Sequence, residues 1–364
     1  MSAPLAGIRV ADFSELLPGP FMTQALVELG AEVIKIERPP QGDPVRAGSP
    51  GLFGTVNRGK RSRMLDLKSE TGRTAALELA AGADIVVEGY RPGVMARLGL
   101  DYAAVQAVNP RVIYLSLTGY GQDGPLRLVP GHDLNYLASA GVTSLCGELG
   151  GPPQHGIGLP VADLGGAMYA LSAILAALYQ RERSGEGQYL DVSMTDCIAH
   201  WLNTRKGVCQ FNGMNSLEDQ RQVALSRPAY GVFACRDGAI TIAALETHFW
   251  MSLVEVLGLR DFAGADYEKL ARRVQHCAPI NAAISSRTAA LGRDEAVALL
   301  LARDIPASPV LTIAEANASA HFQARGLAQD GPVGPLTPFP VRLRGMSPAP
   351  DTLPELTDAK GGKA

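Results

Sequence analysis

Apolar and polar positions along the first half of the chain follow two periods, one typical of buried strands and one typical of helices. Apolar-rich runs predict strands at residues 7–13, 31–37, 84–88, 112–117 and 188–193. Apolar residues spaced three or four positions apart predict helices between them, at residues 21–29, 69–81, 102–108 and 164–179. Because parallel strands need crossover connections, this repeated alternation predicts an α/β fold with an open, doubly wound sheet.

The second half of the chain departs from this alternation. Residues 201–227 are polar and irregular and predict a linker. Apolar stretches at residues 231–233 and 239–243 flank a turn and predict a hairpin, with helices expected at residues 248–257 and 293–302. The expected domains are a large one over residues 1–200, a smaller α+β one over residues 228–315 and a terminal segment over residues 316–364.

Charge and cysteine content narrow the class of protein. The 364 residues carry 33 basic and 36 acidic side chains, a net charge of −3, so no nucleic-acid partner and no anionic membrane surface is expected. The five cysteines form no C-x-x-C pair and no secretory signal is found, which together predict a reduced, cytoplasmic protein. The apolar run at residues 164–179 is shorter than the roughly 20 residues of a membrane span and predicts a buried core helix. No histidine has the spacing of a zinc ligand, so no metal site is expected.

Two candidate catalytic residues lie on glycine-rich connections. His132 follows a glycine, and Asp163 comes 31 residues later, just before the long apolar helix. A histidine and a carboxylate that face one carbon from opposite sides can remove a proton and return it from the other face. The same aspartate can instead attack a carbonyl as a nucleophile. A loop histidine is also often structural, and an aspartate here is typical of a helix N-cap, beside free N–H groups that could stabilise an oxyanion.

Two glycine patterns and a set of basic residues bear on nucleotide binding. The turn after the first strand, residues 16–20, lacks G-x-G-x-x-G, and the literal match at residues 119–124 is followed by Pro125 rather than by a helix. We therefore interpret residues 119–124 as a mobile loop over an active site. Basic side chains nevertheless gather near strand ends, where they can bind a polyphosphate through charge-assisted hydrogen bonds. They are Arg38, the cluster at residues 57–61, Lys68, Arg91 and Arg97.

Five ordered blocks of the sequence resemble the class III CoA-transferase superfamily, which includes the α-methylacyl-CoA racemases. The blocks are residues 5–10, 29–37, 57–68, 88–100 and 120–125. The resemblance implies a Rossmann-like large domain, a small α+β domain and a C-terminal segment that returns to pack on the large domain. It also implies an interlocked homodimer with active sites between the subunits. Coenzyme A would be part of the substrate, with no tightly bound cofactor.

The resemblance also places a CoA site in the sequence. Arg38 and Arg97 look like partners of the phosphate groups. The remaining expected CoA-binding residues are Leu65, Leu67, Lys68, Gly89, Tyr90, Arg91, Gly131, Asp133 and Tyr136.

Residues 131–136 resemble the racemase subgroup, whose catalytic pair would here be His132 and Asp163, with Glu246 supporting the histidine. The expected function is therefore an acyl-CoA racemase or epimerase that inverts the α-carbon of a 2-methylacyl-CoA thioester. Transferases of the superfamily usually lack this histidine and use the aspartate alone as a nucleophile, and residues 156–160 are closer to theirs. A class III CoA-transferase is the first alternative, and a non-catalytic CoA-binding homologue is the second. Proton donation requires a raised pKa for Asp163, whereas an N-cap position would lower that pKa.

Overall fold

The computed structural model describes residues 2–346 and 351–358. Contacts between residues divide the chain into two compact units. The larger contains Met1–Thr143, Ile157–Thr204 and Asn317–Ala364, and the smaller contains Ser144–Gly156 and Arg205–Ala316. This division differs from the expected domains chiefly at Ser144–Gly156, which joins the smaller unit.

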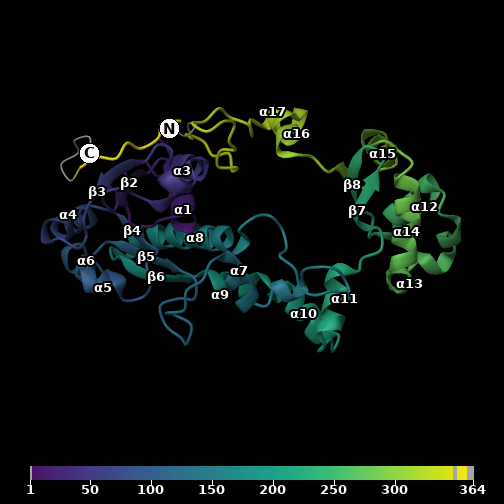
Figure 1. The fold of residues 1–364 in the computed structure, drawn as a ribbon, viewed down its shortest axis with the longest axis horizontal. Coiled ribbons are helices and arrows are strands. Elements are labelled where there is room, and N and C mark those ends of the chain that lie inside the picture. Colours follow the sequence, from purple (N-terminus) through teal and green to yellow (C-terminus); the bar gives the residue numbers. More distant parts are fainter. Residues whose placement is uncertain (1, 347–350, 359–364) are drawn as a thin grey trace. The chain divides into compact units, whose positions relative to one another are not determined.

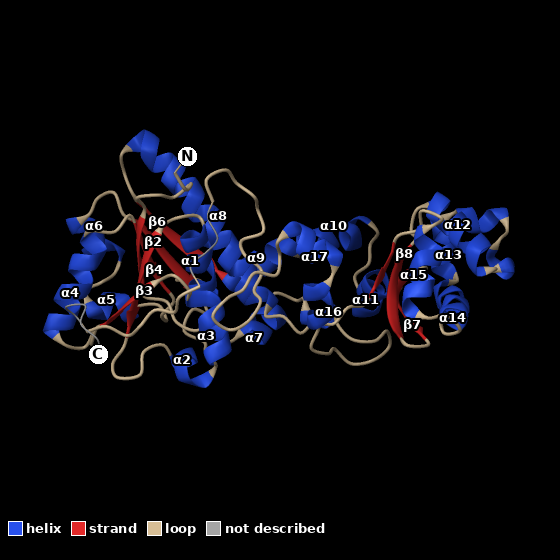
Figure 2. Ribbon diagram, turned by 90° about the horizontal axis from the view of Figure 1, so that it is seen from above, coloured by secondary structure: helices blue, strands red, loops and turns tan. Residues whose placement is uncertain are grey.

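The larger unit is built on a six-stranded parallel sheet. Its strands are β1 (Arg9–Asp12), β2 (Glu32–Glu37), β3 (Arg61–Met64), β4 (Ile85–Glu88), β5 (Ile113–Thr118) and β6 (Gln188–Ser193). The strand order, β3-β2-β1-β4-β5-β6 with every neighbouring pair parallel, confirms the predicted α/β arrangement. Figure 2 shows β2, β3, β4 and β6 of this sheet in red among the blue helices of the larger unit. The winding reverses between β1 and β4, so a ligand-binding crevice is expected outside the carboxyl ends of those strands.

Helices cover both faces of this sheet (Figure 1). The helices of the larger unit up to α9 are α1 (Pro18–Glu28), α2 (Pro44–Gly48), α3 (Pro50–Asn57), α4 (Glu70–Ala81), α5 (Val94–Leu98), α6 (Tyr102–Val108), α7 (Asp133–Ser139), α8 (Val161–Ser184) and α9 (Met194–Trp201). A 3₁₀ turn, η1 (Thr143–Leu145), begins at the last residue of this part of the unit and continues into Ser144–Gly156. On one face, Leu26 of α1 and Ile174 of α8 share a buried cluster with Ile113 of β5. On the other face, Ala76 of α4 shares a second cluster with Tyr114. The sheet is therefore buried on both sides, which explains its continuous apolar strands.

The longest helix of the larger unit, α8, is longer than the sequence predicted. Within the described residues it is the one helix that is long and apolar enough to cross a membrane, and half of that stretch is buried. It packs against α1, β5 and α9, as expected of a core helix. It continues to Ser184, beyond the predicted end at residue 179, because Arg181 is buried in an ion pair with Asp84 (3.0 Å). Gly185 follows in the left-handed region (φ 77°) and ends the helix.

The smaller unit contains a three-stranded antiparallel sheet of β7 (Tyr230–Cys235), β8 (Gly238–Ala243) and β9 (Ala307–Pro309). The predicted hairpin is formed by β7 and β8. Its helices are α11 (Leu217–Leu225), α12 (Thr247–Leu257), α13 (Leu270–Gln275), α14 (Cys277–Thr288) and α15 (Arg293–Leu301), with 3₁₀ turns η2 (Arg260–Phe262) and η3 (Ala265–Glu268). Trp250 and Ile284 lie at the centre of its apolar core.

Residues 201–227 are not irregular, and that part of the prediction is wrong. They contain α10 (Asn203–Phe211) and α11. α10 buries no residue, and α11 buries only Arg221, which donates hydrogen bonds to three backbone carbonyls. Neither helix therefore buries an apolar face within the described residues.

The C-terminal segment belongs to the larger unit from Asn317 onward, near the end of α16 (Ile313–Ala318), and includes α17 (Ala320–Arg325). Met64 N of β3 donates to Thr357 O (2.7 Å), and Glu28 of α1 accepts from the backbone of the same segment. The terminal segment thus contributes to the larger unit of its own chain. Residues 347–350 and 359–364 of this segment lie outside the described residues.

Candidate functional site

A cavity of about 550 Å³ lies at the carboxyl ends of β1, β4 and β5, where a doubly wound sheet is expected to bind its ligand. Its wall comes from the turns after β1 and β4, the loop after β5 and the starts of α7, α8 and α9. The lining residues are 14–16, 18–19, 89–92, 117–120, 127, 129–132, 135–136, 163 and 194. All of them belong to the larger unit.

His132 lies in this wall at the N-cap of α7. Its backbone N–H donates to Asn135 Oδ1 (3.0 Å), and its carbonyl accepts from Asn135 N (2.8 Å). The backbone is therefore fixed, while the side chain is exposed. The imidazole is available to a molecule that enters the cavity.

The loop before His132 is held by Tyr136, one turn into α7. The Tyr136 hydroxyl donates to Gly131 O, and its ring meets Tyr120 edge to face at 5.2 Å. A Cβ on Gly119 would lie 2.2 Å from Tyr136 Cε1, and one on Gly131 would lie 2.7 Å from the same atom. Glycine is needed at both positions for this close approach, which explains why the connection is glycine-rich.

Asp163 lies in the same cavity wall, but it is not the N-cap of α8, so that prediction is wrong. The N-cap is Pro160, and Asp163 is the third residue of the helix. The free N–H groups of the first turn are instead bound by Asp133, whose Oδ1 accepts from Ala162 N (2.6 Å) and Asp163 N (3.1 Å). These two N–H groups are therefore not available to an oxyanion.

The environment of Asp163 favours its protonated form. Burial, followed by the neighbouring charge of Asp133, raises the pKa of the Asp163 carboxyl to about 7. A negative charge beside a partly buried carboxyl disfavours its ionisation. Asp163 can thus hold or release a proton near neutral pH. The expected N-cap position would have lowered this pKa and opposed proton donation, but Asp163 does not occupy that position.

Glu246, the predicted support of His132, belongs to the smaller unit. It occupies the N-cap position of α12 without a side-chain capping bond and is exposed. Its charge interacts with the guanidinium of Arg273, which is buried in the core of that unit beside Trp250. Glu246 is not among the residues that line the cavity.

The predicted CoA-binding residues fall into two groups. Five of them line the cavity: Gly89, Tyr90, Arg91, Gly131 and Tyr136. Six do not: Arg38, Leu65, Leu67, Lys68, Arg97 and Asp133. Within the second group, Leu65 is part of the apolar core with Leu67 packed against it, Lys68 and Arg97 are exposed, and Asp133 binds the start of α8.

Arg38 is connected to the cavity through Glu15. Its Nε lies 3.4 Å from Glu15 Oε1, and its side chain is 62% exposed. Glu15 lines the cavity, and burial raises the pKa of its carboxyl. A phosphate bound by Arg38 would therefore compete with Glu15 for the guanidinium.

The basic cluster at residues 57–61 does not form a polyphosphate site. Arg58 is buried in an ion pair with Glu28, and Lys60 lies inside the unit. Lys60 Nζ has four acceptors nearby, among them Thr23 Oγ1 (2.7 Å) and Asp12 Oδ2 (3.2 Å). Burial lowers the pKa of Lys60 to about 7, and the charge of Asp12 opposes this change.

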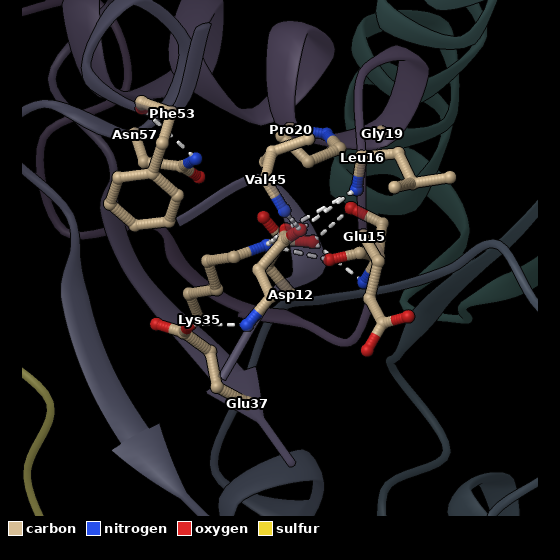
Figure 3. A network of polar contacts seen from close by, with 12 residues as sticks. Asp12, Glu15, Leu16, Gly19, Pro20, Lys35, Glu37, Val45, Phe53 and Asn57 are labelled. Atoms are coloured by element: carbon tan, nitrogen blue, oxygen red, sulfur yellow. Dashed lines mark hydrogen bonds and ion pairs between the residues drawn. The ribbon is translucent and has the colours of Figure 1, made fainter. Parts of the chain in front are cut away.

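The turn after β1, residues 14–19, supplies cavity residues that the sequence analysis did not select. Because this turn lacks G-x-G-x-x-G, the sequence analysis did not predict that it binds a ligand. The signal that would have found it is topological, because the first strand of a doubly wound sheet ends at the point where the winding reverses. Below this turn lies a network of buried polar contacts that contains Asp12 and Lys35 (Figure 3).

The chain is similar to known proteins along nearly its whole length. The model of CoA-transferase family III matches residues 5–355. A succinate–glutarate CoA-transferase from Agrobacterium fabrum is 34% identical, over 93% of this chain and 89% of that protein. An alpha-methylacyl-CoA racemase from Homo sapiens is also 34% identical, over 70% of this chain and 65% of that protein. The crystal structure of a CAIB/BAIF family protein from Brucella suis has a TM-score of 0.87 and 32% identity, covering 98% of this chain and 97% of that one. Over residues 2–346 and 351–358, no group of three or more metal-ligating side chains was found.

Proposed function

Because the chain belongs to CoA-transferase family III, we propose that it binds an acyl-CoA thioester and inverts the configuration at its α-carbon. The observation that carries this proposal is that His132 and Asp163 line one cavity. An aspartate alone is sufficient for CoA transfer, whereas inversion needs two proton-transfer groups. The raised pKa of Asp163, about 7, supports its use as a proton donor.

The reaction moves one proton at each face of the α-carbon. The thioester carbonyl acidifies the α-hydrogen, and neutral His132 removes it to leave an enolate. Protonated Asp163 then donates its proton to the opposite face, so the pair keeps one proton in total while the carbon is inverted. In the reverse direction the two roles exchange. Since Asp133 occupies the N–H groups at the start of α8, the enolate oxygen needs other donors, and the cationic side chains that line this cavity are Arg91 and Arg127.

The test is proton NMR of each enantiomer of a 2-methylacyl-CoA incubated with the protein in D₂O. We expect deuterium at the α-carbon together with loss of optical purity. In His132→Ala, inversion should fall by about 10²–10⁴-fold, the usual contribution of a proton-transfer group. Asp163 should still exchange deuterium slowly from its own face of one enantiomer. His155→Ala is the matched control, because His155 is exposed and does not line the cavity.

The second candidate is a class III CoA-transferase, which the names of most of the relatives favour. In that reaction ionised Asp163 attacks the thioester carbonyl and releases CoA thiolate, leaving a mixed anhydride on the aspartate. The thiolate then attacks the aspartyl carbonyl of this anhydride, which releases the donor carboxylate and leaves an aspartyl-CoA thioester. The acceptor carboxylate attacks that thioester to form a second anhydride and free the thiolate, which attacks the acceptor's carbonyl to give the new acyl-CoA and ionised Asp163. Mass spectrometry would detect a covalent adduct on Asp163, and His132→Ala would have little effect. Absence of α-proton exchange together with transfer of CoA between carboxylic acids would decide for this candidate.

The proposal also includes a site for the CoA moiety and a second copy of the chain as partner. We place the CoA moiety along the turn from Gly89 to Arg91, with Arg38 and Arg97 as phosphate partners, by resemblance to the family. We also propose the interlocked homodimer, in a cytoplasmic protein, with the partner's Glu246 supporting His132. Exposed aromatic side chains on α8 and α9, Tyr179 (62%) and Trp201 (47%), are consistent with a surface that a second chain covers. A folded monomer in analytical ultracentrifugation would contradict the dimer.

A further inference from the structure

A second cavity, of about 340 Å³, lies in the larger unit beside β5, between the end of β4 and the start of α6. Its lining includes Tyr114, which belongs to the apolar cluster on the α4 face of the sheet, whereas Leu117 of the first cavity belongs to the cluster that contains α8. The lining residues are 88, 91, 93, 95–96, 101–103, 114, 116, 122 and 189. Among the described residues, Arg91 is the one that lines both cavities, so the second cavity has a wall of its own.

One wall of the second cavity is aromatic. The ring centroids of Tyr102 and Tyr189 lie 5.4 Å apart, and those of Tyr114 lie 6.1 and 6.0 Å from them. Tyr114 is buried, whereas Tyr189 is 38% exposed and Tyr102 is half-buried, so the latter two rings are accessible. The face of a tyrosine ring carries partial negative charge and attracts a cation placed over it.

Glu88, the last residue of β4, contributes a carboxyl to this cavity and is only 4% exposed. Its Oε2 accepts from Tyr90 N (2.7 Å), and the carboxyl also accepts from Ser116, whose Oγ accepts from the Tyr189 hydroxyl (3.0 Å). The neighbouring charge that acts on the carboxyl is that of Asp191, and it is negative. Within the described part of the chain no cation pairs with Glu88, so a cationic ligand would supply the partner that a buried carboxylate requires.

The charges of the lining favour a cation over an anion. Asp101, at the N-cap of α6, adds a second carboxylate, against which the lining as described contains the single guanidinium of Arg91. The phosphate groups of CoA would therefore be repelled from this cavity. Its volume is nevertheless within the range of about 300–1,000 Å³ that is usual for small-molecule sites.

We infer that the second cavity is a binding site for a flat organic cation, an amidinium or a guanidinium, that pairs with Glu88 and stacks on Tyr189. Such a cation presents two parallel N–H groups, which match the two oxygens of a carboxylate, and its plane packs on an aromatic ring. A compact ammonium would satisfy the charge but would leave the flat wall without a partner. The site goes beyond the proposed function and does not depend on it, because the acyl-CoA is placed in the first cavity.

Isothermal titration calorimetry at about pH 8, where Glu88 is ionised, tests the site with three molecules of similar shape. They are benzamidine, which is a flat cation, benzamide, which is neutral, and benzoate, which is an anion. The wild type should bind benzamidine about 10-fold or more tightly than benzamide, the usual effect of hydrogen bonds to a charged group, and benzoate more weakly still. Saturating free CoA should leave the affinity for benzamidine unchanged.

Two variants of the larger unit locate the bound cation. Glu88→Gln keeps an oxygen that can accept from Tyr90 N but removes the charge, so it should weaken benzamidine about 10-fold or more and leave benzamide unchanged. Tyr189→Leu removes the stacking face and should weaken benzamidine about 2–5-fold. Glu182→Gln is the control, because it removes the same charge from an exposed position outside the cavity, and it should change neither affinity.

The measured affinities decide the inference. Equal affinities of the wild type for benzamidine and benzamide, or an affinity for benzamidine that Glu88→Gln does not reduce, would overturn it. Displacement of benzamidine by CoA would also overturn it, since the probe would then occupy the first cavity. The same holds if the wild type binds none of the three molecules. The proposed function stands or falls separately, by exchange of the α-proton in D₂O.

Discussion

Asp133→Asn should lower the pKa of Asp163 while preserving the start of α8. The asparagine side chain keeps an oxygen that can accept from Ala162 N and Asp163 N, the two bonds that Asp133 now makes. It loses the negative charge that disfavours ionisation of Asp163. The substitution therefore changes the electrostatics of the catalytic residue with little change in local geometry.

The size of the effect has an upper bound. The pKa of Asp163 lies near 7 against an ordinary value of 3.8, a difference of about 3.2, which corresponds to at most about 4 kcal/mol of preference for the protonated form. Burial is the larger of the two causes, so the charge of Asp133 accounts for less than half of this difference. We expect Asp133→Asn to lower the pKa of Asp163 by less than about 1.5 pH units.

Infrared spectroscopy measures this pKa without reference to activity. The C=O stretch of the protonated carboxyl is followed with pH, and the spectrum of Asp163→Asn is subtracted to isolate Asp163. We expect a midpoint near pH 7 in the wild type and a lower one in Asp133→Asn. Asp123→Asn, which removes the same charge from an exposed loop position, is the control and should leave the midpoint unchanged. A wild-type midpoint near 4, or one that Asp133→Asn does not move, would refute the reasoning.

The same titration has opposite consequences for the two proposed reactions. In the racemase, Asp163 must carry its proton when His132 is the base, so the rate in that direction falls as the pH rises through about 7. In the transferase, Asp163 must be ionised, so the rate rises through the same range. Asp133→Asn should move the relevant limb to lower pH in either case. A falling limb with one enantiomer and a rising limb with the other identifies the racemase, whereas the transferase shows a rising limb with every donor.

Three further predictions concern the surroundings of the site. Burial raises the pKa of Glu88 to about 7, so between about pH 4.5 and 7 the folded state binds a proton that the unfolded state has released. The free energy of unfolding should therefore fall, by at most about 3 kcal/mol, as the pH rises through this range. Urea unfolding at pH 5 and 8 measures the fall, which should be absent in Glu88→Gln. Lys60→Met leaves Asp12 buried without its partner and should cost about 3–5 kcal/mol of stability, with a smaller loss in the double variant that also carries Asp12→Asn. Arg38→Ala should weaken CoA binding by about 1.5–3 kcal/mol, whereas Glu15→Gln should strengthen it by freeing the guanidinium; calorimetry showing no change in either variant would exclude Arg38 from the site.

The sheet could be predicted from the sequence because most of its strands are buried on both faces. β1, β2, β4, β5 and β6 each coincide with an apolar-rich run. β3 (Arg61–Met64) was missed because it is an edge strand of largely polar residues. Its Ser62 hydroxyl donates to Glu37 Oε1 (2.6 Å) of the neighbouring strand, so polar contacts replace the apolar ones on which the prediction depends.

The site could be predicted only where the residues that form it lie close together in the sequence. His132 and its glycine-rich loop were found because Gly119 and Gly131 reflect a close approach of Tyr136 from the next helix. The contribution of the turn at Leu16 could not be found in this way. Its conformation is imposed by Asp43, 27 residues further along the chain, and by a lysine on the neighbouring strand.

Asp133 resolves the conflicting expectations for the pKa of Asp163. The start of a helix carries a partial positive charge, which by itself would lower the pKa of a carboxyl in its first turn. Asp133 binds the N–H groups that carry this charge, and its own negative charge remains close to Asp163. Asp133 therefore offsets the pKa-lowering effect of the helix terminus and raises the pKa of Asp163 by repulsion. Burial makes the larger contribution to the raised pKa. A proton that can leave near neutral pH follows from this arrangement of two aspartates, 30 residues apart in sequence, and not from either aspartate alone.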